Sequence, residues 1–112
     1  MFEDRVFSLN TPEEAQAFLV QHPSSVIFKA GTCHKTMQGF GHLQAQLEAQ
    51  GREDLAVGVI KVVEDRPASD WVTEVSGMRH ESPQVILFKE GSAVYELNNW
   101  GITPGAVDQG LL

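Results

Sequence analysis

The sequence turns from a strand pattern to a helix pattern in the stretch Ser25-Val26-Ile27-Phe28-Lys29-Ala30-Gly31-Thr32-Cys33-His34-Lys35-Thr36. Val26-Ile27-Phe28 is an apolar run typical of a buried strand, and after Cys33 apolar residues recur at the helical spacing of one face, at Met37, Phe40, Leu43 and Leu47. Cys33 therefore stands between a strand and the first turn of a helix. Backbone N–H groups and the helix dipole favour an anion at such a position. Since a thiolate is an anion, the stretch predicts a reactive cysteine.

Helix and strand signals alternate on both sides of this stretch. Thr11-Pro12-Glu13-Glu14 predicts a helix start, with Thr11 as N-cap, Pro12 at the first helical position and Glu14 completing a capping box. After Cys33 the sequence predicts a helix to about Gln50, a strand over 55–63 and a helix opened by Pro67. A strand over 84–88 follows, and the turn Glu90-Gly91-Ser92 connects it to a hairpin partner over 93–97. A short helix begins after Thr103-Pro104.

The order of these elements predicts the fold. A strand–helix–strand unit crosses over right-handed and makes its two strands parallel, whereas the closing hairpin is antiparallel. The sheet is therefore mixed. We predict an α/β protein with the thioredoxin-like fold, in which helices flank a central mixed sheet of four to five strands. Residues 1–112 are expected to form a single domain of this kind.

Composition limits the classes of function. Apolar residues make up 42% of the 112 residues and charged residues 21%, which is typical of a globular domain. The net charge of −7 argues against binding to the nucleic-acid backbone. The apolar runs are strand-sized, and the N-terminus shows no secretory signal. With one cysteine no internal disulfide forms, so we expect a cytoplasmic protein without a membrane or nucleic-acid partner.

The reactivity of Cys33 has two interpretations. A free cysteine is commonly a small buried hydrophobe. At a helix N-terminus followed by His34 and Lys35, however, the dipole and two basic side chains favour the thiolate. Such surroundings lower a thiol pKa from about 8.5 to roughly 3.5–7.5. We therefore expect Cys33 to be the nucleophile, with Thr32, His34 and Lys35 beside the substrate.

Thr36 stands where the redox signature Cys-x-x-Cys has its second thiol. Its hydroxyl can donate a hydrogen bond to a thiolate, or it can simply cap backbone in the first helical turn. It cannot resolve a mixed disulfide. Any redox cycle must therefore use Cys33 alone: attack on a mixed disulfide leaves the small thiol on Cys33, and a second external thiol removes it.

Ser82-Pro83 comes immediately before a predicted strand, where proline is tolerated as the first residue. In the thioredoxin-like fold this loop faces the cysteine-bearing helix terminus, so we expect a cis peptide bond, although cis is rare for X–Pro bonds. Arg79 and His80 can add positive potential near Cys33 or bind a carboxylate-bearing thiol. The alternative for both is a solvated loop.

Other kinds of site lack support in the sequence. His34 and His42 with the lone Cys33 do not make a convincing metal set, because structural zinc needs four ligands at compact spacing. We therefore predict no metal. No glycine loop of either standard phosphate-binding spacing is present. Trp100 is ambiguous between packing and the rim of a site.

The segment Arg79-His80-Glu81-Ser82-Pro83-Gln84-Val85 resembles the corresponding part of the monothiol bacilliredoxins, the YtxJ-like family. So do residues 62–69 and 99–103, and the similarity runs from about Val26 to Ala106. The resemblance implies a thioredoxin-like fold and removal of bacillithiol from S-bacillithiolated cytosolic proteins. It also implies Cys33 as the single nucleophile and Pro83 as the cis-proline. The family usually has Thr-Cys-Pro-Ile-Ser, whereas this chain has Thr32-Cys33-His34-Lys35-Thr36, which makes the site more basic.

We therefore predict a cytoplasmic monothiol reductase that acts on mixed disulfides between protein cysteines and a low-molecular-weight thiol. Bacillithiol would be its co-substrate, S-thiolated proteins its partners, and no cofactor would be tightly bound. The predicted substrate-binding residues are Thr32, His34, Lys35, Thr36, Arg79, His80, Ser82 and Pro83. Two alternatives stay open: a non-catalytic thioredoxin-like binding module, and an iron–sulfur carrier in which two chains share a cluster through Cys33.

Overall fold

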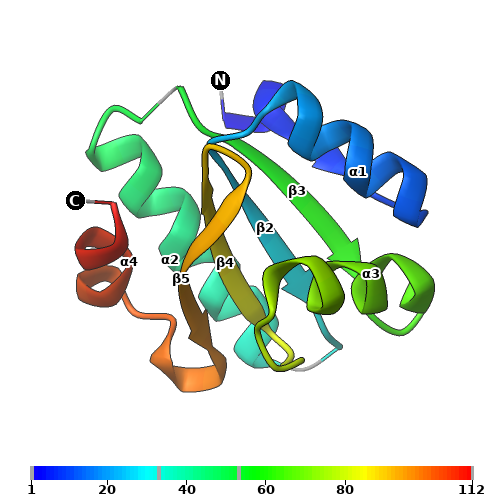
Figure 1. The fold of residues 1–112 in the computed structure, drawn as a ribbon. Helices are drawn as coiled ribbons and strands as arrows, with labels where there is room; N and C mark the ends of the chain where they lie inside the picture. Colours follow the sequence, from blue (N-terminus) through cyan, green and yellow to red (C-terminus); the bar gives the residue numbers. More distant parts are fainter. Residues whose placement is uncertain (1, 33, 53, 112) are drawn as a thin grey trace.

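A computed structural model describes residues 2–32, 34–52 and 54–111 (Figure 1). Its elements along the chain are η1 (Phe2–Arg5), β1 (Val6–Ser8), α1 (Pro12–Gln21), β2 (Ser25–Ala30), α2 (His34–Ala49), β3 (Ala56–Lys61), α3 (Arg66–Ser76), β4 (Gln84–Lys89), β5 (Ser92–Asn98), η2 (Asn99–Gly101) and α4 (Pro104–Gly110).

Five strands of the described chain form one sheet in the order β1-β3-β2-β4-β5. β3 pairs in parallel with β1 and β2, while β4 pairs antiparallel with β2 and β5. The mixed sheet predicted from the order of elements is therefore confirmed. The N-terminal strand β1 was not assigned from the sequence, where Val6 and Phe7 stood out only as a short apolar lead. It forms because Val6–Ser8 lie along the free edge of β3.

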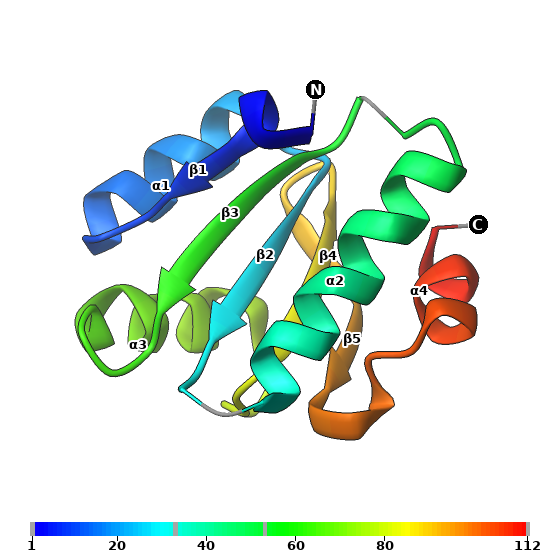
Figure 2. The same cartoon turned by 180° about the vertical axis from the view of Figure 1, so that it is seen from behind.

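The helices cover both faces of this sheet (Figures 1 and 2). Because successive side chains of a strand point to opposite faces, the sheet has two separate apolar cores. One core joins Val26 and Phe28 of β2 to Leu43 and Leu47 of α2. The other joins Ile27 of β2 to residues of α1 and α3. β2 is thus buried on both faces, and it leads directly to the start of α2.

Local capping signals set the helix ends. The side chain of Thr11 accepts a hydrogen bond from the N–H of Glu14 at 3.1 Å, as expected of an N-cap. The carboxylate of Glu14 turns one residue further back than a capping box requires and accepts from the N–H of Asn10 at 2.7 Å. Thr103 caps α4 in the same way, through the N–H of Ala106. α3 ends at Gly77, whose φ of 69° is left-handed.

The predicted turn between β4 and β5 is a tight hairpin. Glu90 and Gly91 are its two central residues, and both have positive φ, 53° and 85°. Positive φ at both positions belongs to the turn type whose twist matches paired strands. The turn sets the pairing next to it, Lys89 with Ser92 and Phe88 with Ala93, and an irregularity between Leu87 and Phe88 then shifts the register so that Gln84 lies opposite Asn98.

One predicted apolar face is wrong. Met37 was expected to face the core with Leu43 and Leu47, but it is 76% exposed. Six residues of α-helix turn through about 600°, which puts Met37 about 120° around α2 from Leu43. Gly39 is only about 40° from Leu43 by the same count, and it is buried. A Cβ on Gly39 would lie 3.2 Å from Cδ1 of Ile102, so a side chain of the η2–α4 connection fills the space there.

Candidate functional site

The predicted site lies at one end of the sheet, where β2 leads into α2 and where the chain enters β4 (Figure 1). The prediction for Cys33 falls on a residue outside the described ranges. Its neighbours in sequence are both exposed: Thr32 precedes it, and His34 is the first residue of α2. The chain is therefore open to solvent at the residues on either side of the cysteine.

The loop that enters β4 lies directly against the segment that precedes Cys33. A Cβ built on Gly31 would lie only 2.5 Å from Oγ of Ser82 and 3.2 Å from Oγ1 of Thr36. The N–H of Gly31 donates to that same Thr36 oxygen at 3.0 Å. Thr36 and Ser82 thus both lie against Gly31, although the three residues come from different parts of the sequence. Because Thr36 accepts this bond, the proton of its hydroxyl is still available for donation.

Pro83 anchors the loop to the sheet. It is buried, it immediately precedes β4, and the peptide bond between Ser82 and Pro83 is cis, the isomer favoured from the sequence. The carbonyl of Pro83 accepts a hydrogen bond from the N–H of Asn99 at 2.9 Å. The backbone of Ser82, in contrast, makes no hydrogen bond with the residues described here. Its N–H and C=O are therefore available to an extended peptide.

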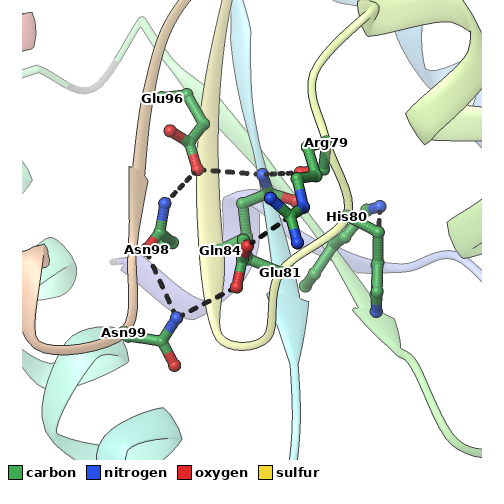
Figure 3. Close-up of polar contacts among 8 residues, drawn as sticks. Arg79, His80, Glu81, Gln84, Glu96, Asn98 and Asn99 are labelled. Carbon is green, nitrogen blue, oxygen red and sulfur yellow. Dashed lines mark hydrogen bonds and ion pairs between the residues drawn. The ribbon is translucent and has the colours of Figure 1, made fainter.

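A chain of polar contacts connects the start of α2 to Arg79, and Figure 3 shows its part from Asn99 through Glu81 to Arg79. Nζ of Lys35 donates to Oδ1 of Asn99 at 3.1 Å, and Nδ2 of Asn99 donates to Oε1 of Glu81 at 3.3 Å. Nε of Arg79 lies 3.8 Å from the other oxygen of Glu81. The Arg79 side chain is 91% exposed, so this ion pair contributes little to stability. Glu81 partly balances the positive charge that Arg79 was predicted to bring.

Lys35 also lies beside Trp100. Its Nζ is 5.9 Å from the centroid of the indole ring, a distance at which a cation and an aromatic face attract each other. Trp100 is 64% exposed. The sequence left Trp100 ambiguous between packing and the rim of a site, and this exposure places it at the surface beside the start of α2.

Polar side chains hold the other side of the loop (Figure 3). Gln84 is fully buried, and its Nε2 donates to the carbonyl of Arg79 and to Oε2 of Glu96, both at 2.9 Å. Asn98 donates to the same Glu96 oxygen at 2.7 Å. These bonds tie residues 79–84 to β5, which restricts how the Ser82 backbone can move relative to the sheet.

Lys29 is the functional candidate that the sequence analysis missed. It is fully buried, and its Nζ lies 2.7 Å from Oγ1 of Thr73 and 3.2 Å from Nδ1 of His80. Burial lowers the pKa of Lys29 to about 8, although Asp70 opposes the shift. The signal was a lysine at the end of an apolar strand run, which no local pattern distinguishes from a lysine at a solvated strand end.

His80 differs from the sequence expectation in its charge. Desolvation and the neighbouring Lys29 lower the pKa of His80 below its ordinary value, which favours the neutral ring at neutral pH. The positive charge expected from His80 is therefore carried by Lys29 behind it. Sequence reasoning could not foresee this, because Lys29 and His80 are 51 residues apart.

The described ranges contain no group of three or more His, Cys, Asp or Glu residues arranged to hold a metal ion. None of their helices combines the length and the hydropathy that a membrane crossing requires.

Comparison with known proteins adds a family and a fold. The family model described as monothiol bacilliredoxin BrxC matches residues 7–107. A solved protein with a thioredoxin fold superposes with a TM-score of 0.86 at 19% identity, covering 99% of this chain and 97% of its own. Oxidized mitochondrial thioredoxin 3 from Saccharomyces cerevisiae gives 0.73 at 21% identity, covering 98% and 96%. Fasciola hepatica thioredoxin gives 0.69 at 11%, covering 94% and 95%. At these identities the solved structures establish the thioredoxin fold alone, as predicted.

Proposed function

Because the chain belongs to the monothiol bacilliredoxin family, we propose that it reduces mixed disulfides between protein cysteines and a low-molecular-weight thiol through the sulfur of Cys33. The family and the fold support a role in thiol–disulfide exchange. We further propose that the small thiol is of the bacillithiol type and that the substrates are S-thiolated proteins of the cytoplasm.

The reaction needs two exchanges. In the first, the Cys33 thiolate attacks the small-thiol sulfur of the mixed disulfide. A bond forms between Cys33 and that sulfur, the original S–S bond breaks, and the protein thiolate leaves and takes up a proton. In the second, a free molecule of the small thiol attacks the disulfide on Cys33. This attack releases the oxidised dimer of the small thiol and restores Cys33, so the free small thiol is the reductant.

The observation that carries the proposal is that Ser82 lies against Gly31, whose N–H bonds Thr36. It brings a loop with an unbonded backbone beside the residues that lead to the cysteine. An extended substrate can pair with the N–H and C=O of Ser82, in the manner of a strand added to a sheet edge. The substrate sulfur would then lie close to the segment Thr32 to His34.

The remaining predicted residues suit an acidic small thiol. Lys35 is an ammonium group at the start of α2, Arg79 is an exposed guanidinium, and His80 lies at the surface two residues before Ser82. The hydroxyl of Thr36 has a proton to donate to a thiolate. Thr32 and His34 are exposed beside Cys33 and would contact the protein part of the substrate.

The direct test is reduction of an S-bacillithiolated protein, followed by mass spectrometry of both proteins. We expect turnover by the wild type, none by Cys33→Ser, and a wild-type intermediate that carries one bacillithiol on Cys33. His42→Ser is a matched control, and this variant should remain active. His42 lies on another part of α2, where its side chain bonds the carbonyl of Ile102. A wild-type rate no faster than that of Cys33→Ser would contradict the proposal.

A second measurement separates an enzyme from a binding module. The rate of alkylation of Cys33 by iodoacetamide, followed against pH, reports the pKa of the thiol. A reductase requires a pKa below the ordinary value of about 8.5, because the thiolate is the nucleophile. An unreactive thiol, or one that titrates at or above that value, would favour a module that binds a partner without catalysis.

A further inference from the structure

Lys29 is a cation in the interior of the protein, and Asp70 is the acidic group that acts on it electrostatically. It is fully buried in β2 and is flanked in the sheet by Ile60 of β3 and Gln84 of β4. Side chains alternate along a strand, so Lys29 lies on the same face as Ile27, which packs in the core formed with α1 and α3. None of the ion pairs found among the described residues includes Lys29. A buried charge without a direct ion pair needs hydrogen bonds to stabilise it.

The directions of those hydrogen bonds can be assigned. The hydroxyl of Thr73 donates to the carbonyl of Ser69 at 3.2 Å, so its oxygen accepts from Nζ of Lys29 at 2.7 Å. An ammonium group can only donate. Nδ1 of His80, 3.2 Å from Nζ, is therefore an acceptor and carries no proton. The hydroxyl of Ser69, 3.4 Å from Nδ1, can add a second donor to the same nitrogen.

We infer that Lys29 is a positioning residue for His80: its ammonium group holds the imidazole neutral with the proton on Nε2, so that His80 offers a fixed N–H donor to an acidic group of the substrate. The inference rests on the proposed function for the identity of that acidic group. The state of the imidazole itself does not depend on it.

His80 lines a surface hollow of about 270 Å³ that suits such a group. The hollow is formed by Val62, Val63, Arg66, Ser69, Asp70 and His80. The N–H of Val62 donates to the carbonyl of Ala30 at 3.0 Å, so the hollow borders the segment that leads to Cys33. A carboxylate in the hollow would find the guanidinium of Arg66 and the N–H of His80. Asp70 carries the opposite charge and would limit the affinity.

The charges around the pair favour this state at neutral pH. With the pKa of Lys29 at about 8, roughly nine-tenths of the molecules carry the ammonium group at pH 7. The pKa of His80 is lowered by desolvation, by Lys29 and by Arg66, against the opposing effects of Asp70 and Glu81. Across the sheet, β3 and β4 present the uncharged Ile60 and Gln84. Above about pH 8 Lys29 loses its proton, and the imidazole is free to change tautomer.

Long-range ¹H–¹⁵N spectra of labelled protein test the state of His80 directly. At pH 7 we expect the wild type to show Nδ1 unprotonated and Nε2 protonated. In Lys29→Met we expect a mixture of tautomers and a higher His80 pKa, because a neighbouring positive charge is gone. Lys61→Met removes a lysine whose side chain is 61% exposed at the end of β3, and it should leave the spectrum unchanged. A proton on Nδ1 in the wild type, or an unchanged tautomer in Lys29→Met, would overturn the inference.

The wild type alone provides a second test, should Lys29→Met fail to fold. Between pH 7 and pH 9.5 the single Nε2–H pattern of His80 should give way to a mixture. A pattern that stays constant over this range would show that the ammonium group does not hold the ring.

Kinetics test the role in binding. Lys29→Met should lower kcat/KM about three- to tenfold for an S-bacillithiolated protein, the range expected for one hydrogen bond. Lys29→Met should lower kcat/KM less than twofold when the same substrate protein carries neutral β-mercaptoethanol in its mixed disulfide. Equal losses for both substrates would refute the binding role. If the wild type reduces neither substrate, the proposed function fails, while the spectra of His80 still decide whether Lys29 holds the ring.

Discussion

Replacing Gly31 with alanine tests the contact on which the candidate site depends. The new Cβ would lie 2.5 Å from Oγ of Ser82 and 3.2 Å from Oγ1 of Thr36. The first distance is too short for two heavy atoms, so the Ser82 side chain must rotate or the loop before β4 must move away from Gly31. Gly31 is not among the glycines with positive φ, so its backbone accepts alanine without strain. Any loss of stability will therefore come from the contact.

The size of the effect follows from two opposing terms. Forcing an extra carbon into a packed region costs about 1–3 kcal/mol. Replacing glycine reduces the entropy of the unfolded chain, which returns about 0.4–1 kcal/mol. We therefore expect Gly31→Ala to lose roughly 1–2 kcal/mol of unfolding free energy. In the Ser82→Ala background the Oγ is absent, and the nearest Ser82 atom is then its Cβ at 3.7 Å, an ordinary contact. Most of the loss should disappear there.

The assay is urea unfolding of the wild type, both single variants and the double variant, followed by tryptophan fluorescence. The cycle should give a coupling of about 1 kcal/mol, above the 0.3–0.5 kcal/mol within which independent sites add. Gly41→Ala is the matched control, because a Cβ there would meet nothing within 4 Å. Lying inside α2, Gly41→Ala should gain about 0.5–1 kcal/mol.

Two results would refute this reasoning. One is a Gly31→Ala variant as stable as the wild type. The other is a Ser82→Ala background in which Gly31→Ala costs as much as before. Either would mean that the Ser82 loop does not press against Gly31, and the proposed function would lose the observation that carries it.

Three further predictions concern stability and are measured by the same unfolding assay. Because the pKa of Lys29 is lowered to about 8 from 10.5, the unfolded chain binds a proton between these pH values that the folded chain lacks. Wild-type stability should therefore rise with pH in this window relative to Lys29→Met, by at most about 1.4 kcal/mol per pH unit, and equal slopes would contradict the prediction. Asn99 has a φ of 51°, so Asn99→Ala should be about 1 kcal/mol less stable than Asn99→Gly, which keeps that conformation without strain; equal stability would argue against it. Thr103→Ala should cost about 1 kcal/mol, since it removes the cap on the N–H of Ala106, and a loss below about 0.3 kcal/mol would show that the cap is dispensable.

Much of the fold could be predicted because its signals are local. Thr11 and Thr103 cap helices through backbone groups three residues away, and Gly77 ends α3 with its own left-handed conformation. Glu90 and Gly91 close the hairpin as predicted. Given these elements in this order, the handedness of the crossovers leaves few arrangements besides a mixed sheet.

The apolar face of α2 shows where a spacing argument is too coarse. Residues at intervals of three or four drift around a helix, so Met37 fits the pattern of Leu43 and Leu47 but points elsewhere. The position that does face inward is Gly39, which has no side chain to reveal it. Its burial depends on Ile102, which is distant in sequence.

The sequence by itself determined the order of the helices and strands from α1 onward, the mixed sheet, and the likeness of residues 79–85 to a family with one reactive cysteine. Only the tertiary structure decided that Gly31 touches Ser82, that Lys35 reaches Asn99, and that Lys29 bonds His80. The reason is physical. Capping, turn and crossover preferences act over a few residues of chain. The burial that lowers the pKa of Lys29, in contrast, comes from α3, and the His80 ring that Lys29 bonds comes from the loop after α3.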